Sequence, residues 1–342
     1  MQYNEKYNDD NSIVISPFTI SFCRLNKNYK IISITIILIC MINMIIYLNF
    51  KKDNNQIYFD KYETFTFNEI KEKLQRTKCS IMWGNQREFI NGIIRKFKPK
   101  KSVELGVLHG GSSIIILNAI KDISNSFLFS IDIKTGDFVG KCVYNYFPYL
   151  KNKWRLFKGD IAARYIEKIG NNIELAMIDT SHFEPGEILD FLMILPFLKE
   201  EAIVIFHDID QQITLSKGKD MRNEWAPYII FNLIRGKKYL PSGKGILNKD
   251  IGAIKLEKNQ KRFTHDYCRA LGGQWQYFPP EKHIVAIINF FKKYYDRDCL
   301  TILQESIRFN RQFVKDNPKE DFYLKFRRKK LNKSLRNRTK LI

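Results

Sequence analysis

Residues Val103–Ser112 read VELGVLHGGS, and this stretch decides the fold. Its apolar start predicts a strand, and its glycines predict a tight turn that opens a helix near Ser112. Glycines let a ligand approach the backbone closely, and the start of a helix offers free N–H groups. The spacing GxxxGG differs from the GxGxxG dinucleotide motif, and no Gly-Lys-Ser/Thr sequence follows as in a P-loop. The stretch therefore predicts a strand–turn–helix unit for a different kind of ligand.

Short apolar runs alternate with helical patterns from Lys101 onward, which predicts a parallel sheet with helices on both faces. The predicted strands are Ser102–Leu105, Phe127–Ile131, Trp154–Phe157, Glu174–Ile178 and Ala202–Phe206. The predicted helices are Ser112–Lys121, Asp137–Leu150, Ile161–Ile169, Pro185–Lys199 and Glu224–Ile234. Two later runs, Lys237–Leu240 and Ile251–Leu256, predict an antiparallel pair at the sheet edge. The fold class is therefore α/β, with a Rossmann-like doubly wound sheet.

The same patterns divide the chain into regions. Residues 1–30 form a polar tail, residues 31–50 an apolar run, and residues 51–99 a linker with two amphipathic helices between 66 and 97. Residues 100–257 form the α/β domain. Residues 258–342 show no strand pattern and are expected to form a helical extension with helices at His283–Tyr295 and Leu300–Val314, followed by a basic tail at Lys325–Lys340.

The apolar run Ile31–Phe50 predicts a transmembrane helix, because it holds no charged side chain and is bracketed by Lys30 and Lys51. A run of this length, at about 1.5 Å of rise per residue, spans the ~30 Å hydrocarbon core of a bilayer. No small-residue cleavage site ends the run, which disfavours a removable signal peptide. The alternative is a buried core helix or a wrongly assigned start codon. Basic residues balance on the two sides, so the positive-inside rule assigns no orientation.

The chain is strongly basic, with a net charge of +21, and 44% of its residues are apolar, enough for a full core. Such a charge favours either a nucleic-acid partner or an anionic membrane surface. No two of the six cysteines have the CxxC spacing of zinc or redox motifs. We therefore expect reduced thiols in a cytosolic protein.

Acidic residues close three successive predicted strands, at Glu104, Asp132 and Asp160. In open α/β sheets, ligands lie outside the carboxyl ends of the strands. Glu104 would repel a pyrophosphate and suits a cationic ligand, such as the amino end of methionine on a sulfonium cofactor. Asp132 is placed to accept both ribose hydroxyls, and Asp160 to meet an adenine edge. His109, inside the Gly-rich turn, is expected to shape that loop.

Carboxylates and imidazoles follow the next two predicted strands, with Asp179 and His182 after one and His207 and Asp208 after the other. Histidine titrates near neutral pH, so His182 suits removal of a proton from a substrate hydroxyl. The oxygens of Asp179 and Asp208 suit Mg²⁺, whereas His207 shifts the preference toward Mn²⁺, Fe²⁺ or Zn²⁺. A metal-free site, with His207 as an ordinary strand-end histidine, is the alternative.

The order of these motifs resembles that of class I S-adenosylmethionine-dependent methyltransferases. The resemblance is carried, in order, by ELGV at Glu104–Val107, HGGS at His109–Ser112, Asp132, Asp160, DTSH at Asp179–His182 and His207–Asp208. The branch that it resembles most contains cephalosporin-hydroxylase-like proteins and macrocin-type sugar O-methyltransferases. The resemblance covers residues 100–257, about half of the chain.

The resemblance implies a seven-stranded sheet with the last strand antiparallel. It also implies a cofactor site in which S-adenosylmethionine is surrounded by Glu104, Gly106, His109, Gly110, Gly111, Ser112, Asp132 and Asp160. It makes His182 the base. Metal-dependent relatives bind Mg²⁺ through an Asp after strand four and an acidic pair after strand five. Here Asp179, His207 and Asp208 stand at those positions, so a histidine replaces the first acid of the pair. The ligand set expected for Mg²⁺ or Mn²⁺ therefore departs from the family pattern.

The expected function is methylation of a hydroxyl on a sugar or a lipid-linked glycan, with His182, Asp179 and Asp208 as catalytic residues. One alternative is an RNA methyltransferase, motivated by the net charge, although no aromatic base-flipping motif lies near the fourth strand. The other alternative is an inactive membrane-tethered scaffold of the same fold. The catalytic domain is expected in the cytoplasm, where S-adenosylmethionine is made, with the basic tail against the anionic leaflet of the cell membrane.

Overall fold

The computed structural model describes residues 56–59, 62–80, 82, 84–209, 225–242 and 250–316. All described residues belong to one compact unit of the chain, within residues 53–342. The predicted tail, transmembrane helix and basic tail lie outside the described residues. Within the described part, no helix is both long enough and apolar enough to cross a bilayer.

One mixed sheet carries the described part of the chain. Its strands are β1 (Gln56–Phe59), β2 (Lys101–Leu105), β3 (Phe127–Asp132), β4 (Trp154–Lys158), β5 (Ile173–Ile178), β6 (Leu198–His207), β7 (Gly236–Pro241) and β8 (Ile251–Leu256). Their order across the sheet is β1-β7-β8-β6-β5-β2-β3-β4. All neighbours are parallel except β8, which is antiparallel to both β6 and β7. The α/β class and the antiparallel last strand are therefore confirmed.

The predicted count of seven strands is wrong, because β1 adds an eighth. β1 pairs in parallel with β7, with Gln56 opposite Lys238 and Phe59 opposite Pro241. The antiparallel β7–β8 pair therefore lies inside the sheet rather than at its edge. A four-residue strand whose first three positions are exposed or half-exposed has too little apolar alternation to be found in a sequence. Its extended conformation depends on the distant partner β7.

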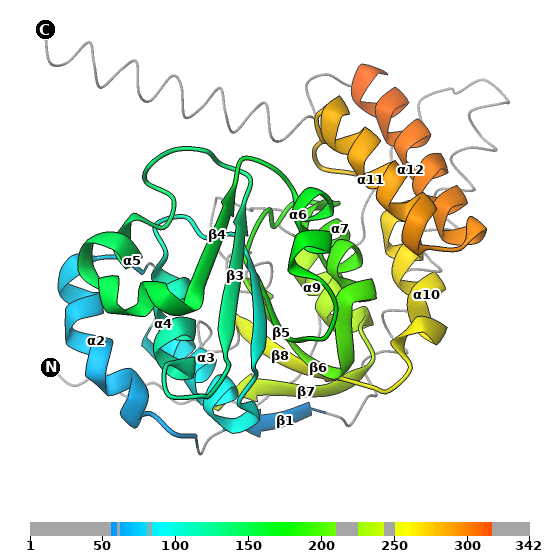
Figure 1. Ribbon diagram of the computed structural model, residues 1–342. Coiled ribbons are helices and arrows are strands. Elements are labelled where there is room, and N and C mark those ends of the chain that lie inside the picture. Colours follow the sequence, from blue (N-terminus) through cyan, green and yellow to red (C-terminus); the bar gives the residue numbers. More distant parts are fainter. Residues whose placement is uncertain are drawn as a thin grey trace, which may run out of the picture. The chain divides into compact units, whose positions relative to one another are not determined.

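Helices cover both faces of the sheet (Figure 1). One face packs against α2 (Phe65–Thr77), α3 (Gly84–Phe97), α4 (Gly111–Ile120) and α5 (Lys141–Tyr146). The other face packs against α6 (Ala162–Ile169), α7 (Gly186–Ile194) and α9 (Ala226–Leu233). Outside these helices, α10 (Thr264–Arg269) contacts α7 and α9, α11 (Glu281–Tyr294) contacts α6, and α12 (Arg297–Asp316) packs against α10 and α11. The helical character of the C-terminal extension is thus confirmed.

Central strand β5 shows how the sequence builds these two layers. Leu175 and Met177 belong to the core cluster on one face, whereas Ala176 and Ile178 belong to the cluster on the other. Successive side chains of a strand point to opposite faces, so a strand covered on both sides must be apolar throughout. The run in β5 is the sequence signature of this arrangement.

Prolines shorten two of the predicted helices. The helix expected at Asp137–Leu150 is instead α5 followed by the 3₁₀ helix η1 (Pro148–Lys153). The helix expected at Pro185–Lys199 ends at Ile194, where the 3₁₀ helix η2 (Leu195–Phe197) with Pro196 leads into β6. Proline lacks a backbone N–H and clashes with the preceding turn, so it stops an α-helix more firmly than apolar periodicity extends it.

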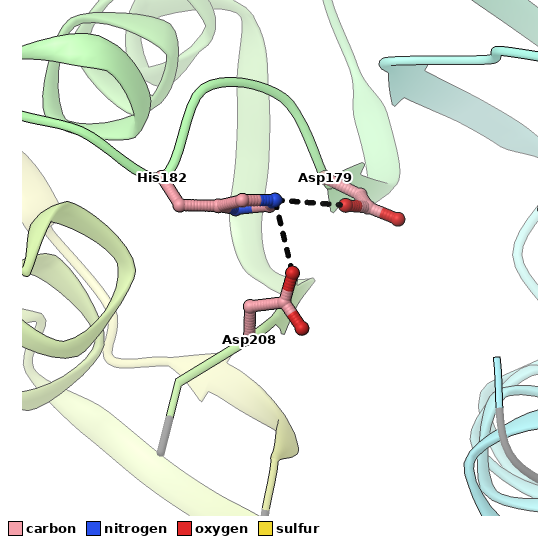
Figure 2. Close-up of side chains that lie close together, drawn as sticks. All are labelled: Asp179, His182 and Asp208. Carbon is pink, nitrogen blue, oxygen red and sulfur yellow. Dashed lines mark ion pairs between the residues drawn. The ribbon is translucent and has the colours of Figure 1, made fainter. Parts of the chain in front are cut away.

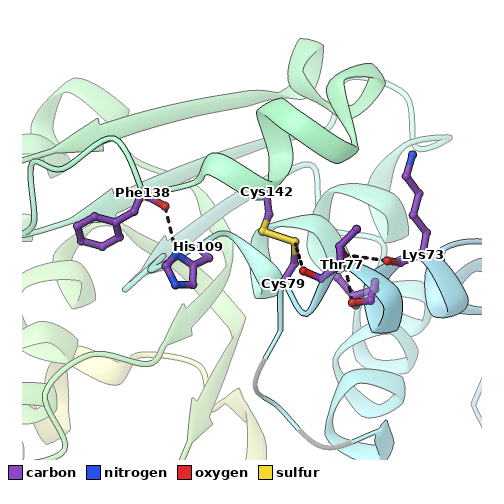
Figure 3. The surroundings of a disulfide bond; sticks show 7 residues. Lys73, Thr77, Cys79, His109, Phe138 and Cys142 are labelled. Carbon is purple, nitrogen blue, oxygen red and sulfur yellow. Dashed lines mark hydrogen bonds between the residues drawn. A yellow bond between two sulfur atoms is a disulfide. The ribbon is translucent and has the colours of Figure 1, made fainter. Parts of the chain in front are cut away.

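A disulfide corrects the expectation that all thiols are reduced. Cys79, which precedes α3, is bonded to Cys142 in α5, whereas Cys268 and Cys299 are free and buried. The Cys79 carbonyl lies against the position of Gly111, and the Cys142 N–H donates a hydrogen bond to the His109 carbonyl at 3.0 Å. Figure 3 shows the disulfide beside the Gly-rich turn. The bond therefore joins two segments that support this turn.

Candidate active site

The carboxyl ends of β5 and β6 bring the predicted acid and histidine residues together. The two strands are parallel neighbours, with Ile178 opposite Phe206. Asp179 and Asp208 directly follow these strand ends, and the loop after Asp179 returns His182 toward them (Figure 2). Strand ends in a parallel sheet meet at one edge, which is where open α/β folds bind ligands.

Asp208 lies between two imidazoles. Its Oδ2 is 2.9 Å from Nε2 of His182, and its Oδ1 is 3.1 Å from Nδ1 of His207. Oδ1 of Asp179 is 4.0 Å from Nε2 of His182 and 3.5 Å from Nδ1 of His207. On its far side, His207 has Nε2 3.3 Å from Oε1 of Gln86 in α3. The structure thus brings together all four residues predicted for this cluster.

The charges in the cluster shift its pKa values strongly. Burial alone would lower the pKa of His182, but hydrogen bonds to Asp208 and Glu187 raise that pKa well above its usual 6.5. Burial would likewise lower the pKa of His207, but Asp179 and Asp208 raise it well above the same value. Burial would raise the pKa of Asp208, yet the two imidazoles hold it well below its usual range. The protonation states of His182, His207 and Asp208 therefore depend on one another.

The donor set of the cluster fits a divalent metal ion. One ligand atom each from Asp179, His182 and Asp208 lies within 4.8 Å of the others. Nδ1 of His207 is buried beside the same carboxylates without a full hydrogen bond within the described part of the chain. Two carboxylates with an imidazole suit Mn²⁺ or a similar ion. Both His182 and His207 lie close enough to the carboxylates to supply that imidazole.

The Gly-rich turn lies directly against this cluster. Gly106 has φ of 86°, and a Cβ there would stand 1.9 Å from the Asp179 carbonyl oxygen. The Asp179 N–H also donates to the Leu105 carbonyl at 3.0 Å. Only glycine tolerates both the positive φ and the close approach, so Gly106 keeps the turn and the Asp179 loop in contact. Gly110, with φ of 91°, leads into α4, which starts at Gly111.

Asp132 holds the Gly-rich turn from the end of β3. Its Oδ2 accepts the N–H groups of Val107 at 3.0 Å and Leu108 at 2.9 Å, and its Oδ1 accepts the N–H of Lys134 at 2.8 Å. Charge-assisted hydrogen bonds of this kind fix a loop firmly. The predicted contact of Asp132 with ribose hydroxyls stays a prediction, and its support of the turn is an additional role.

Glu104 lies beneath the turn and is completely buried. Its oxygens accept the hydroxyls of Ser112 at 2.5 Å, Ser113 at 2.6 Å and Ser130 at 2.6 Å. Burial raises the pKa of Glu104 to about 7, although the serine hydroxyls act in the opposite direction. Three partners already occupy the carboxylate, and the predicted contact of Glu104 with the cofactor stays a prediction.

The remaining predicted residues lie at the margins of the site. Nδ1 of His109 is 3.4 Å from the Phe138 carbonyl oxygen, and the two rings meet edge to face. These contacts fit the expectation that His109 shapes the turn. Asp160 accepts the N–H of Ile161 at 2.9 Å, and its Oδ1 is 3.5 Å from Nε2 of His283 in α11. The C-terminal extension therefore reaches the side expected for the adenine.

The loop that carries His182 is also held by the C-terminal extension. The Glu184 N–H donates to Oε1 of Gln276 at 2.9 Å, and the Gln276 N–H donates back to the Glu184 carbonyl at 2.9 Å. These residues are 92 positions apart in the chain. Residues far outside the predicted α/β domain thus position the loop of the candidate base.

Glu187 is a member of the site that the sequence analysis missed. It is completely buried in the first turn of α7, and its Oε1 is 3.1 Å from Nδ1 of His182. The only signal in the sequence was an acid five residues after His182 at the start of an apolar helix. Gln86, from α3, was missed as well, because nothing in the sequence connects it with His207.

Comparison with protein-family models matches residues 103–209 to a family described as "Methyltransferase domain". The match covers about a third of the chain and runs from the Gly-rich turn to the end of the Asp208 segment. No curated protein matches the chain.

Several solved methyltransferase structures are similar. The O-methyltransferase from Bacillus cereus in complex with SAH shows 15% identity and a TM-score of 0.43 over 56% of this chain and 90% of that one. The O-methyltransferase TomG from Streptomyces achromogenes, involved in tomaymycin synthesis, shows 12% identity and a TM-score of 0.42 over 57% and 91%. A methyltransferase from Podospora anserina shows 14% identity and a TM-score of 0.42 over 70% and 99%. Similarity at this level assigns no substrate to this chain.

Proposed function

Because residues 103–209 form an S-adenosylmethionine-dependent methyltransferase domain, we propose that this chain methylates a hydroxyl group. The observation that carries the proposal is His182, whose Nε2 faces Asp208 at 2.9 Å and Asp179 at 4.0 Å at the strand ends. A hydroxyl is a weak nucleophile, so its methylation calls for a base at the reacting oxygen.

In the proposed reaction, His182 Nε2 takes the proton of the acceptor hydroxyl as its oxygen bonds to the methyl carbon. Asp208 and Glu187 then stabilise the imidazolium that forms, since each contacts one ring nitrogen. S-adenosylmethionine, when bound, supplies an electrophilic methyl group and leaves as a neutral thioether. Asp132 orders the Gly-rich turn on which the cofactor is expected to rest.

We include a divalent metal, Mg²⁺ or Mn²⁺, in the proposal as a conditional partner of the site. Asp179 and Asp208 would hold it, with His207 as the predicted imidazole ligand. Its positive charge would lower the pKa of the acceptor hydroxyl and of His182. His182 then stays available as the base, while His207, backed by Gln86, completes the ligand set.

For the acceptor, we propose a sugar or a lipid-linked glycan hydroxyl. The proposal rests on the resemblance to sugar O-methyltransferases and on the apolar run Ile31–Phe50, which would keep the enzyme at a membrane. We propose that the catalytic domain faces the cytosol, where its cofactor is made. The Cys79–Cys142 disulfide argues for the opposite side, because disulfides persist in oxidising compartments.

The test is methyl transfer by the full-length protein from S-adenosylmethionine with a labelled methyl group. We expect label in a membrane glycolipid extract, in a form that resists mild alkali, as a methyl ether does and a methyl ester does not. Label in bulk RNA alone would instead support the RNA methyltransferase that the charge of +21 suggests. Cofactor binding without transfer to either acceptor would support the inactive scaffold.

A further inference from the structure

Glu187 reaches the underside of His182 because the loop between them folds back tightly. A Cβ at Gly186 would stand 2.2 Å from the Ser181 carbonyl oxygen, so only glycine permits this fold. α7 begins at Gly186 and places Glu187 in its first turn. Its carboxylate is consequently held below the imidazole rather than in solvent.

The carboxylate of Glu187 is oriented independently of the imidazole. Its Oε1 accepts the Thr180 N–H at 3.1 Å and lies 3.1 Å from Nδ1 of His182. Its Oε2 is buried and makes no hydrogen bond to any residue that the structure describes. One oxygen therefore makes both contacts, and a backbone amide fixes the position of that oxygen.

The two nitrogens of His182 are thus divided between two environments. Nδ1 faces the buried Glu187, whereas Nε2 faces Asp208 and Asp179 at the strand ends. In a neutral imidazole, one ring nitrogen carries the proton. The hydrogen bonds of the two ring nitrogens decide which one it is. The carboxylate of Glu187 favours a proton on Nδ1 and holds the ring there, whereas Asp208, at 2.9 Å, acts on Nε2.

A purely structural role explains these contacts less well. An acid in the first turn favours a helix through its dipole, but an exposed carboxylate does so without the cost of burial. α7 is otherwise apolar on its buried face, and Glu187 is the member of the helix that contacts His182. Asp190, one turn later, also contacts Thr180, through Oγ1 at 2.5 Å. It provides a matched control.

We propose that Glu187 is a positioning residue for His182: it accepts the Nδ1 proton and fixes the ring so that Nε2 points to the strand ends, where the acceptor is expected. The inference rests on the proposed role of His182 as base. Its effect on turnover is exerted through the imidazole alone, without contact with the acceptor or the cofactor.

The first experiment needs no acceptor. Long-range proton–nitrogen spectra of the full-length protein with ¹⁵N-labelled histidine report which ring nitrogen is protonated, and H182A assigns the signal among five histidines. We expect a protonated, hydrogen-bonded Nδ1 in the wild type and in D190A, and a loss of that signature in E187A. A wild-type spectrum with an unprotonated Nδ1 would overturn the proposal even if E187A failed to fold.

The second experiment is a double-mutant cycle on methyl transfer to the glycolipid extract. We expect E187A to lower turnover by about 10–100-fold, as for residues that orient a functional histidine, with cofactor affinity unchanged. E187Q, which keeps an oxygen under the Thr180 N–H, should restore most of the rate. In the H182A background, E187A should have no further effect.

Additive losses in the cycle, or equal losses in E187A and D190A, would reject the positioning role. Absence of transfer by the wild type would reject the proposed function instead. In that case the spectra still decide whether Glu187 sets the protonation of His182.

Discussion

At the scale of single residues, Asp208 is shared by two rings, because Oδ2 contacts His182 and Oδ1 contacts His207. A charge on one ring raises the cost of a charge on the other, so the two imidazoles titrate as a pair. Binding of a cation between the carboxylates would release protons from the same pair. The protonation of His182 is therefore a property of the whole cluster.

Replacement of His182 tests its role as base most directly. H182A should lower turnover by about 10²–10⁴-fold, the usual contribution of a general base, because no other imidazole faces the same side of Asp208. Cofactor affinity, measured by calorimetry, should barely change. The control is H265A, a histidine of α10 outside the cluster. Near-normal turnover of H182A would remove His182 from the mechanism.

Metal dependence is predicted to be conditional, since a histidine stands beside the two carboxylate ligands. Chelation should lower the rate, and Mn²⁺ should restore it at least as well as Mg²⁺. H207A should abolish the response to added metal, because His207 is the predicted ligand. Full activity in chelator, with no metal detected in the protein, would exclude the metal site.

The buried Glu104 predicts a pH dependence of stability. Burial raises its pKa from 4.5 to about 7, so the folded protein keeps this proton in a range where the unfolded chain has lost it. The free energy of unfolding should fall as pH rises from 4.5 to 7, by up to about 3 kcal/mol for this group. E104Q should lose this component in urea titrations at pH 5 and pH 8. An equal change in the free energy of unfolding between pH 5 and pH 8 in both proteins would contradict the raised pKa.

The sequence predicted the main cluster because it lies at strand ends, where local pattern and topology agree. Asp179 and Asp208 each follow an apolar run, and adjacent parallel strands bring their ends together. Glu187 and Gln86 were not predictable in this way. Their contacts depend on the fold-back at Gly186 and on how α3 packs, and neither is encoded in local periodicity.

At the scale of elements, apolar periodicity predicted most strands and helices, but it extended two helices past the prolines that end them. The predicted strand Ile251–Leu256 has the bounds of β8, and the predicted Ile161–Ile169 differs from α6 by one residue. β1 failed because its conformation is imposed by pairing with β7 across some 180 residues of chain. Nonlocal pairing leaves no local signature.

Asp132 holds the Gly-rich turn in place through hydrogen bonds from its backbone N–H groups. D132A removes the acceptor of three backbone N–H groups, at Val107, Leu108 and Lys134. The affinity for S-adenosylmethionine should fall by about 1–3 kcal/mol, measured by calorimetry, through the turn and through any ribose contact. D132N, which keeps one acceptor oxygen, should lie between. Unchanged affinity in D132A would refute the assignment of this turn to the cofactor.

The disulfide predicts a link between redox state and the same turn. Cys79 and Cys142 are 63 residues apart, and closing such a loop stabilises the fold by about 4 kcal/mol in the chain-entropy description. Reductant should lower the free energy of unfolding of the wild type and leave a C79S/C142S variant unaffected. Cofactor affinity should fall in parallel, because both cysteines contact the turn. A wild type that ignores reductant would show that the bond is absent in solution.

At the scale of the whole molecule, the C-terminal extension is part of the main core. Trp275, Phe291 and Leu303 belong to the same apolar cluster as β5 and β6. The boundary predicted at residue 257 therefore does not separate two independent cores. A protein cut there would expose the apolar surfaces of α7 and α9 to water.

Membrane attachment is the prediction that belongs to the complete chain. Carbonate-washed membranes should retain the full-length protein, because Ile31–Phe50 is expected to span the bilayer. Protease added outside intact cells should leave the catalytic domain uncut if it faces the cytosol. Release by carbonate would defeat the anchor, and external cleavage would place the disulfide-bonded domain outside the cell.

The reciprocal hydrogen bonds between Glu184 and Gln276 set an order for the folding of the chain during its synthesis. A ribosome that has just finished the His182 loop must add 92 more residues before the partner of Glu184 exists, which takes several seconds at roughly 5–20 residues per second. Until then the loop lacks its two hydrogen bonds to Gln276. A chain that ends before Gln276 therefore lacks these two hydrogen bonds to the loop of the candidate base.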